Sequence, residues 1–461
     1  MAAFGLGLAL RLFFVLHFPS EAGDTRIYEE LARNWHDYGV YGLFINGHLT
    51  PVDIRVPGYP AFLATVSAVI GQSRLAVMFC QALLDLLTCF LAATLAGRLA
   101  PPASRERVST AALWLAALCP FTANYTAVLL TEVVVTFFTT LALLIFVYAA
   151  DGQEEFRLRV GIHSFSLGLW FAGGLVVGMG TLVRPETPLL LTAVGIVLGV
   201  RWRKPADWPR LLRASLWMTG GLFLVLLPWG VRNWTSLDRV QLLAPRYAQL
   251  PEEYVPRGFF AWTKTWLVRF RDVYLVMWKL EDEPIYLADL PASAFDSEQE
   301  REQVRTLLAE YNEHLKIPPP LDGKFARLAR ERTHRHPLRT FLWIPFSRAG
   351  TIWFTPRVEL LPYSGHLWPL SQQWDEDRED FLVTIGLGLL NVFYIGLAIF
   401  GAWRRRTCRG IWLLACYFVI RTAFLTQIEA PEPRYVMVCF PAVLSLAALS
   451  WIKSPKSPEP R

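Results

Sequence analysis

Residues 76–98, with the sequence AVMFCQALLDLLTCFLAATLAGR, contain only two charged residues, Asp85 and the terminal Arg98. A helix needs about 20 mostly apolar residues to cross the hydrocarbon core of a bilayer. This run is therefore long enough to span a membrane. The composition of the whole chain agrees, because 53% of its 461 residues are hydrophobic and only 18% are charged. A typical soluble domain has about 25% charged residues.

Similar runs recur along the chain and predict about ten transmembrane helices. The first run lacks a basic start and carries Arg11 in its middle, which favours a retained anchor over a cleaved signal peptide. The predicted fold class is an all-α polytopic membrane protein with helices lying at its outer interface. The predicted spans are residues 2–18, 76–98, 108–122, 126–150, 163–182, 187–201, 211–230, 381–403, 410–427 and 435–452.

The distribution of arginine and lysine predicts which side of the membrane each connection faces. Short loops rich in these residues lie on the cytoplasmic side. Residues 201–213 and 404–409 are strongly basic, and this pattern places both termini in the cytoplasm of an inner-membrane protein. Basic inner loops facing anionic lipid account for the net charge of +6, so we expect no nucleic-acid partner.

Two segments between the predicted spans are too long to be simple connections. The first outer loop covers residues 19–75, and its run PGYPAFLATVSAVIG (57–71) predicts a helix lying in or re-entering the outer interface. The second is a mainly helical extracytoplasmic insert. The predicted organisation is a transmembrane core at 1–235, the insert at 236–380, C-terminal spans at 381–452 and a disordered cytoplasmic tail at 453–461.

Two elements of the insert are predicted in more detail. The motif SEQE at 297–300 is a capping box, and the apolar residues after it have helical spacing, so a helix is expected over 298–315. The apolar run at 340–354 contains a proline and an arginine. We expect it to lie on the membrane surface or to re-enter, because a single crossing would place the basic 404–406 segment outside.

Asp24 stands about six residues beyond the first predicted span, in the stretch GDTRIYEELARNW (23–35). A carboxylate at a membrane surface can take a proton from a substrate while the reacting group is shielded from bulk water. Aspartate also caps helices, and a helix is expected to begin near Thr25. The two roles are compatible, because a helix N-terminus keeps a carboxylate ionised.

Six further charged residues are predicted near the outer ends of spans. Glu132, in LLTEVVVTFF, is expected about two turns inside the fourth span, where a carboxylate must be paired or face water. Glu186 lies beside Arg184 in LVRPETP, so an ion pair between them is the alternative to a direct function. Arginine binds phosphate oxygens in a two-pronged manner, although a single arginine is more often an interfacial anchor. The candidate phosphate-binding arginines are Arg55, Arg184, Arg232 and Arg434.

Arg11 and Asp85 lie at similar depths in two predicted spans, so we expect a buried salt bridge between them. Neither the six cysteines nor the histidines have the spacing of a metal site. The sequence therefore predicts no cofactor and leaves a divalent metal open.

The order of these motifs resembles the GT-C superfamily of membrane glycosyltransferases. The motifs are the Asp24 loop, ELARN, RVPGYPAFLATVSAVIG, LLTE, LVRPE, PWGVRNW, a large outer insert and EPRYVMVCFPAVLSLA. The resemblance is strongest to the branch that contains protein O-mannosyltransferases and lipid A aminoarabinose transferases. It covers the first 235 residues and the last 50 better than the insert.

The resemblance implies an inverting transfer of a sugar from a polyprenyl monophosphate on the outer, periplasmic or exterior face. It implies that Asp24 is the catalytic base and that Arg55, with the other outer arginines, holds the lipid phosphate. Many relatives have a second acidic residue directly after the first, where this chain has Thr25. A supporting acidic role is therefore expected of Glu132 or Glu186. The expected partners are the lipid-linked sugar, the bilayer and a glycan, lipid or protein acceptor.

Three other functions are compatible with the same sequence. A ligase or polymerase of the superfamily would use a pyrophosphate-linked donor. A transporter or flippase would place charged residues near the midplane on several helices, and only Arg11 and Asp85 fit that pattern. A noncatalytic relative would bind lipid only.

Overall fold

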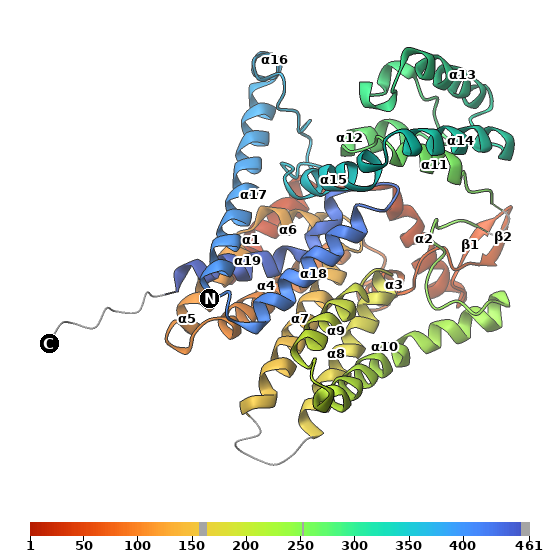
Figure 1. Cartoon of the computed structure of the whole chain (residues 1–461). Coiled ribbons are helices and arrows are strands. Elements are labelled where there is room, and N and C mark those ends of the chain that lie inside the picture. Colours follow the sequence, from red (N-terminus) through yellow and green to blue (C-terminus); the bar gives the residue numbers. More distant parts are fainter. Residues whose placement is uncertain (156–163, 251–252, 453–461) are drawn as a thin grey trace. The chain divides into compact units, whose positions relative to one another are not determined.

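A computed structural model describes residues 1–155, 164–250 and 253–452. The predicted tail at 453–461 and the first residue of the predicted span 163–182 lie outside these ranges. The chain divides into two compact units, coloured along the sequence in Figure 1. The first unit comprises Met1–Ala248, Pro356–Ile420 and Met437–Arg461, and the second comprises Gln249–Thr355 and Arg421–Val436.

The described part of the first unit is helical apart from a short β-hairpin. Strands β1 (Gly42–Ile45) and β2 (His48–Pro51) are antiparallel, with Gly42 opposite Pro51. The helices are α1 (Ala2–His17), α2 (Gly23–Tyr38), α3 (Gly58–Ile70), α4 (Arg74–Leu99), α5 (Arg105–Ala117), α6 (Pro120–Asn124), α7 (Glu132–Glu155), α8 (Ser164–Val183), α9 (Leu189–Arg201), α10 (Trp208–Leu237), α16 (Leu370–Glu376), α17 (Arg378–Arg404) and α19 (Phe440–Ala448). Helix α18 (Arg409–Leu425) begins in the first unit and ends in the second.

Five helical segments among the described residues are long and apolar enough to cross a membrane. They are Arg74–Leu99, Glu132–Ala150, Pro205–Leu237, Arg378–Arg404 and Pro433–Trp451. Helices α1, α3 and α9 and the segment Leu167–Val183 are apolar but shorter. The chain is thus a mainly helical membrane protein, as expected, whereas the count of ten spans stays a prediction.

One predicted span is not a continuous helix in the structure. Residues 108–122 were expected to form a single span, but α5 ends at Ala117 and Pro120 begins the separate short helix α6. Proline has no backbone N–H to donate and favours the first turn of a new helix. The continuous apolar composition concealed this break.

Helices α8 and α10 pack closely through glycine, and they lie side by side in Figure 1. A Cβ at Gly174 of α8 would collide with the carbonyl group of Met218, and one at Gly221 of α10 with that of Phe171. Small residues let two helix backbones approach in this way inside membranes. Helix α8 also packs against α7.

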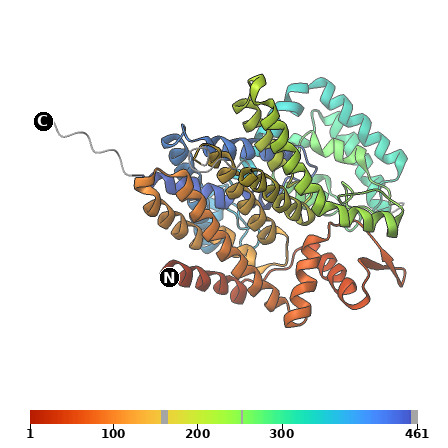
Figure 2. The ribbon, with the colours of Figure 1, turned by 90° about the horizontal axis from the view of Figure 1, so that it is seen from below.

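The expected ion pair between α1 and α4 is present. Arg11 donates to the Asp85 carboxylate at 2.6 Å, and both side chains are almost fully buried. Other Arg11 donors bond the carbonyl oxygens of Gly7 and Ala117. Figure 2 shows α1, in dark red, beside the orange α4 that it joins through this pair.

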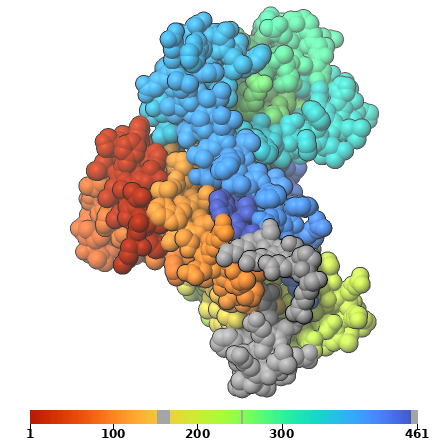
Figure 3. Space-filling view, turned by 90° about the vertical axis from the view of Figure 1, so that its left-hand side faces the viewer, coloured from red at the N-terminus to blue at the C-terminus, as the bar shows by residue number. Residues whose placement is uncertain are grey.

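Helix α17 illustrates the surface that these spans present. Its exposed side chains include Leu389, Val392, Phe393 and Ile399. In Figure 3 this helix forms a blue column on the face toward the viewer. A continuous row of exposed apolar side chains is what a lipid-facing helix presents.

The second unit is also helical. Its helices are α11 (Arg257–Lys264), α12 (Phe270–Asp272), α13 (Glu298–His314), α14 (Pro319–Arg335) and α15 (Ile344–Trp353). The aromatic residues Phe259, Trp262 and Phe325 lie at the centre of its core. The helix predicted over 298–315 is thereby confirmed to within a residue.

The capping box of α13 is only half as predicted. The Ser297 hydroxyl accepts from the Glu300 backbone N–H at 3.1 Å, as a cap should. The Glu300 carboxylate binds the guanidinium groups of Arg332 and Arg335 on α14. Tertiary ion pairing therefore replaces the local return bond of the box.

The apolar run at 340–354 forms a π-helical turn, Arg339–Trp343, followed by α15. Its side chains Phe341, Trp343 and Phe346 are each about two-thirds exposed or more. This exposure fits a segment that lies against a membrane, which remains a prediction.

Candidate active site

Helix α2 begins with Gly23, and its N-terminus is fixed by contacts with a distant segment. The Thr25 hydroxyl accepts from the Ala22 N–H at 3.2 Å and donates to the carbonyl oxygen of Leu129. Ser20 N–H donates to the carbonyl oxygen of Ala127. The first loop is thus tied to the segment just before α7, and Asp24 lies in the first turn of α2.

Asp24 forms an ion pair with Arg55. Nη2 of Arg55 donates to Oδ1 of Asp24 at 2.8 Å, and the two side chains are 21% and 29% exposed. The Tyr41 hydroxyl donates to the Arg55 carbonyl oxygen and so fixes the backbone of that residue. Because both side chains keep accessible surface, this pair is open to a ligand.

Burial and neighbouring charges shift the pKa values of the groups around this pair. Burial is the largest single effect and would lower the pKa of Arg55, but the Asp24 carboxylate, together with Tyr28 and Tyr41, outweighs it and raises the pKa above the usual value. Burial, reinforced by Asp24, raises the pKa of Tyr28 to about 12. Tyr28 therefore stays neutral and can donate a hydrogen bond, while Arg55 stays cationic.

A second cluster lies where α8 ends and α7 begins. Arg184 donates to Glu132 at 3.1 Å and to Glu186 at 2.8 Å. The ion pair predicted as the alternative role of Glu186 is thus present, and Arg184 is shared by two carboxylates. The cluster carries a net charge of −1, which does not favour a phosphate at Arg184.

The depth predicted for Glu132 is corrected by the structure. We expected this residue two turns inside a span beginning at residue 126, but it is the first residue of α7. Residues 125–127 form a 3₁₀ turn and Val128 is extended, pairing with Ser20. Glu132 is nevertheless buried, at 2% exposed, and it is paired with Arg184, as a carboxylate in such surroundings requires.

The two clusters meet at Tyr28. Arg55, Arg184, Asp24 and Glu132 all influence the pKa of its buried hydroxyl. The Tyr28 ring packs edge-on against Tyr59 of α3, with centroids 5.1 Å apart. The structure therefore brings four of the predicted site residues within electrostatic range of Tyr28, and Glu186 is linked to them through Arg184.

Arg232 of α10 lies close to the same loop but binds backbone. Its Nη1 donates to the carbonyl oxygen of Val52 at 2.8 Å, and its Nη2 donates to that of Tyr41. The guanidinium also stacks on the Tyr41 and Trp229 rings. It thus fixes the shape of the loop that carries Arg55.

Arg434 belongs to the second unit. Its Nε lies 2.6 Å from the Glu432 carboxylate, and its guanidinium stacks on Tyr435. Both contacts are with residues of the EPRY motif itself, so Arg434 is paired with its neighbours in the sequence.

Asp53 is a residue of interest that the sequence analysis missed. It is 2% exposed, and its Oδ2 has no hydrogen-bond partner among the described residues. It lies within electrostatic range of Arg232 and Tyr41. The acidic residue two positions before Arg55 was visible in the sequence, but its burial followed only from the fold.

The described residues contain no group of three or more histidine, cysteine, aspartate or glutamate side chains arranged to hold a metal ion.

No model of a known protein family matches the sequence, and no curated protein matches it. Several solved structures, however, do match the structure of this chain. The oligosaccharyltransferase of Archaeoglobus fulgidus, in a complex with zinc and sulfate, matches at 13% identity and a TM-score of 0.49, over 97% of this chain and 48% of that chain. The same organism's AglB, with an inhibitory peptide and a dolichol-phosphate, matches at 10% identity and 0.48, over 97% and 49%.

A further match is ArnT from Cupriavidus metallidurans bound to undecaprenyl phosphate. Its identity is 12% and its TM-score 0.43, over 97% of this chain and 77% of that chain. The chain is similar in structure to these proteins. It spans about half the length of the archaeal oligosaccharyltransferase chains that it matches.

Proposed function

We propose that this protein is an inverting glycosyltransferase that moves a sugar from a polyprenyl monophosphate to a hydroxyl acceptor on the outer face of the membrane. The observation that carries the proposal is the accessible Asp24–Arg55 pair at the start of α2. It joins a potential base to a potential phosphate ligand across 31 residues of sequence. The order of motifs around it resembles the GT-C superfamily.

In the proposed reaction, the acceptor hydroxyl lies between Asp24 and the anomeric carbon of the donor sugar. Asp24 takes the hydroxyl proton while the new carbon–oxygen bond forms. The bond from the anomeric carbon to the phosphate oxygen breaks on the opposite face, and its electron pair leaves with the polyprenyl phosphate. Attack opposite to the leaving group inverts the anomeric centre.

Arg55 has two tasks in this scheme. Before the donor binds, it forms an ion pair with the Asp24 carboxylate, which is the form that can accept a proton. When the donor phosphate is present, the guanidinium can turn one N–H toward the leaving oxygen, where it stabilises the developing charge. The partial exposure of both side chains permits this exchange.

The other candidates are assigned supporting tasks. Glu132 and Glu186 hold Arg184, which is one of the charged groups that act on Tyr28. Arg232 fixes the loop of Val52 and Tyr41. We therefore propose that Arg55 contributes more to donor binding than Arg184, Arg232 or Arg434.

The first test is sugar transfer by the purified full-length protein in detergent. Each member of a panel of polyprenyl-phosphate hexoses and pentoses is mixed with an acceptor-containing membrane extract, and released polyprenyl phosphate is measured. Release by the wild type and by Asp37→Asn, but not by Asp24→Asn, supports the proposal. Asp37 is a matched control because it lies on the same helix and its partner is the adjacent His36.

Two outcomes contradict the proposal. Equal release by wild type and Asp24→Asn removes the catalytic assignment. Activity confined to pyrophosphate-linked donors, or movement of intact lipid without transfer, favours the ligase or the transporter.

A further inference from the structure

A largely apolar pocket of about 560 Å³ lies in the first unit, between α7, α8, α9 and α18. Its walls include Val194 and Leu198 of α9 and Leu413 and Cys416 of α18. Ligand sites commonly have volumes of about 300–1,000 Å³. The pocket is thus large enough for an organic ligand, and the proposed glycosyl transfer does not use it.

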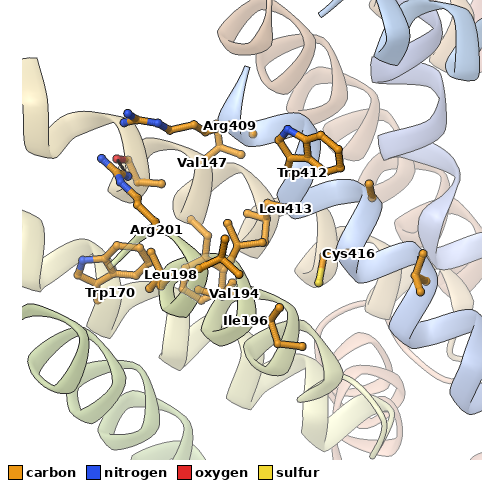
Figure 4. A pocket seen from close by; sticks show the side chains of 17 residues that line it. Val147, Trp170, Val194, Ile196, Leu198, Arg201, Arg409, Trp412, Leu413 and Cys416 are labelled. Atoms are coloured by element: carbon orange, nitrogen blue, oxygen red, sulfur yellow. Dashed lines mark hydrogen bonds between the residues drawn. The ribbon is translucent and has the colours of Figure 1, made fainter. Parts of the chain in front are cut away.

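Two arginines stand at one edge of this pocket. Arg201 ends α9 and Arg409 begins α18. Figure 4 shows both guanidinium groups at the same edge, with Leu413, Ile196 and Cys416 extending away from them. Trp412 also lines the pocket, and tryptophan is enriched where helices meet the lipid headgroups.

The length of α7 places this edge far from the candidate active site. Arg201 Nη1 donates to the carbonyl oxygen of Ala150 at 2.7 Å, whereas Glu132 starts the same helix. Eighteen residues of α-helix correspond to about 27 Å. The hydrocarbon core of a bilayer is about 30 Å thick, so the arginines and Glu132 are separated along α7 by nearly the thickness of that core.

We propose that this pocket binds an anionic phospholipid from the leaflet opposite the candidate active site. One acyl chain lies between α9 and α18, and the phosphate lies against Arg201 and Arg409. Both helices already expose apolar side chains to lipid, including Ile196, Val200 and Val419. The headgroup should be anionic, because Arg201 and Arg409 are the charged residues in a pocket lining that is otherwise mostly apolar.

The same geometry distinguishes this ligand from the proposed sugar donor. The donor phosphate must reach Arg55, which lies beside Asp24 at the other membrane face. An inner-leaflet phospholipid meets Arg201 and Arg409 directly. The inference is therefore independent of which sugar or acceptor the protein uses.

Native mass spectrometry of the purified full-length protein provides the first test. Phosphatidylglycerol, phosphatidylcholine and undecaprenyl phosphate are titrated separately. A basic side chain near an anionic lipid is worth roughly fivefold in affinity. The double variant Arg201→Gln/Arg409→Gln should therefore lose roughly tenfold or more in phosphatidylglycerol affinity, and little in phosphatidylcholine affinity.

Arg213→Gln is the matched control. Arg213 is an exposed basic residue in the first turns of α10, close in sequence to Arg201, and it does not line the pocket. It should leave phosphatidylglycerol affinity unchanged. Equal losses in both variants, or equal affinity of the wild type for the two phospholipids, would overturn the proposal.

Photo-cross-linking locates the acyl chain and tests the pocket without changing its charge. Phosphatidylglycerol with a diazirine in one acyl chain should label peptides containing residues 194–200 and 410–419. Cys416→Trp, which fills the pocket, should remove this labelling, whereas Ile399→Trp on the lipid-facing side of α17 should retain it. Labelling that persists in Cys416→Trp, or tighter binding of undecaprenyl phosphate, contradicts the assignment.

Discussion

Two of the aspartate–arginine pairs described in the first unit have nearly equal lengths and very different surroundings. Arg11 and Asp85 lie 2.6 Å apart with 0% and 4% of their side chains exposed. Arg55 and Asp24 lie 2.8 Å apart with 21% and 29% exposed. The chemistry of the two contacts is the same, so accessibility separates a structural pair from a candidate catalytic one.

The remaining donors of the two arginines show the same difference. Arg11 also bonds the carbonyl oxygens of Gly7 and Ala117, so it joins α1, α4 and the end of α5. Arg55 uses Nη1 for the carbonyl oxygen of Ile54 next to it. A buried pair that ties several helices resists exchange, whereas a pair at a loop surface can change partners.

Replacing the exposed aspartate should affect activity most. Asp24→Asn keeps the size of the side chain but removes the base, and loss of a general base costs a factor of about 100 to 10,000 in rate. The initial rate of sugar transfer should fall by that factor while the melting temperature stays unchanged. If the melting temperature of Asp24→Asn fell together with its activity, Asp24 would have a structural role instead.

Replacing the buried aspartate should have the opposite effect. Asp85→Ala leaves Arg11 charged and buried, which destabilises proteins by about 3–5 kcal/mol. Denaturant unfolding in detergent should show this loss. The double variant Arg11→Met/Asp85→Leu should recover much of the stability, because no unpaired charge remains. Failure to recover would mean that the pair has a role beyond packing.

Arg55→Ala should weaken the use of donor without abolishing folding. A charge-assisted hydrogen bond is worth about 1.5–3 kcal/mol, which corresponds to roughly a 10- to 100-fold loss in kcat/KM. The loss should appear when donor concentration is varied. Arg26→Ala is the control, because that arginine is 82% exposed and its partner is Glu21. Equal effects of both variants would contradict a specific role.

Glu132→Gln should have a smaller effect, about three- to tenfold in rate, because Arg184 keeps Glu186 as a partner. The change should lower kcat at saturating donor rather than raise KM. A loss as large as that of Asp24→Asn would instead identify Glu132 as the base.

The exposed ion pairs that Arg74 forms with Glu29 and Glu21 should contribute least. The three side chains are 49%, 26% and 38% exposed, and exposed pairs contribute about 0–1 kcal/mol. Arg74→Gln should change the free energy of unfolding by no more than this, and salt should reduce the difference further. A larger loss would show that exposure does not separate the pairs.

The sequence located the helices better than their ends. Hydropathy depends on composition over about 20 residues, so it found the apolar segments. The start of α7 at Glu132 depends on the pairing of Ser20 with Val128, which are more than 100 residues apart. The break between α5 and α6 likewise depended on the local geometry around Pro120.

By itself, the sequence determined the membrane class and the helix of residues 298–315, because hydropathy and helical periodicity are local properties of the chain. It also predicted the Arg11–Asp85 pair, because the two charges lie at similar depths in their spans. Only the tertiary structure decided that Asp24 pairs with Arg55, that Glu132 and Glu186 share Arg184, and that Asp53 is buried. These facts depend on which distant segments meet. Charge alone does not specify a partner, because the energy of an ion pair depends on distance and burial, and the fold sets both.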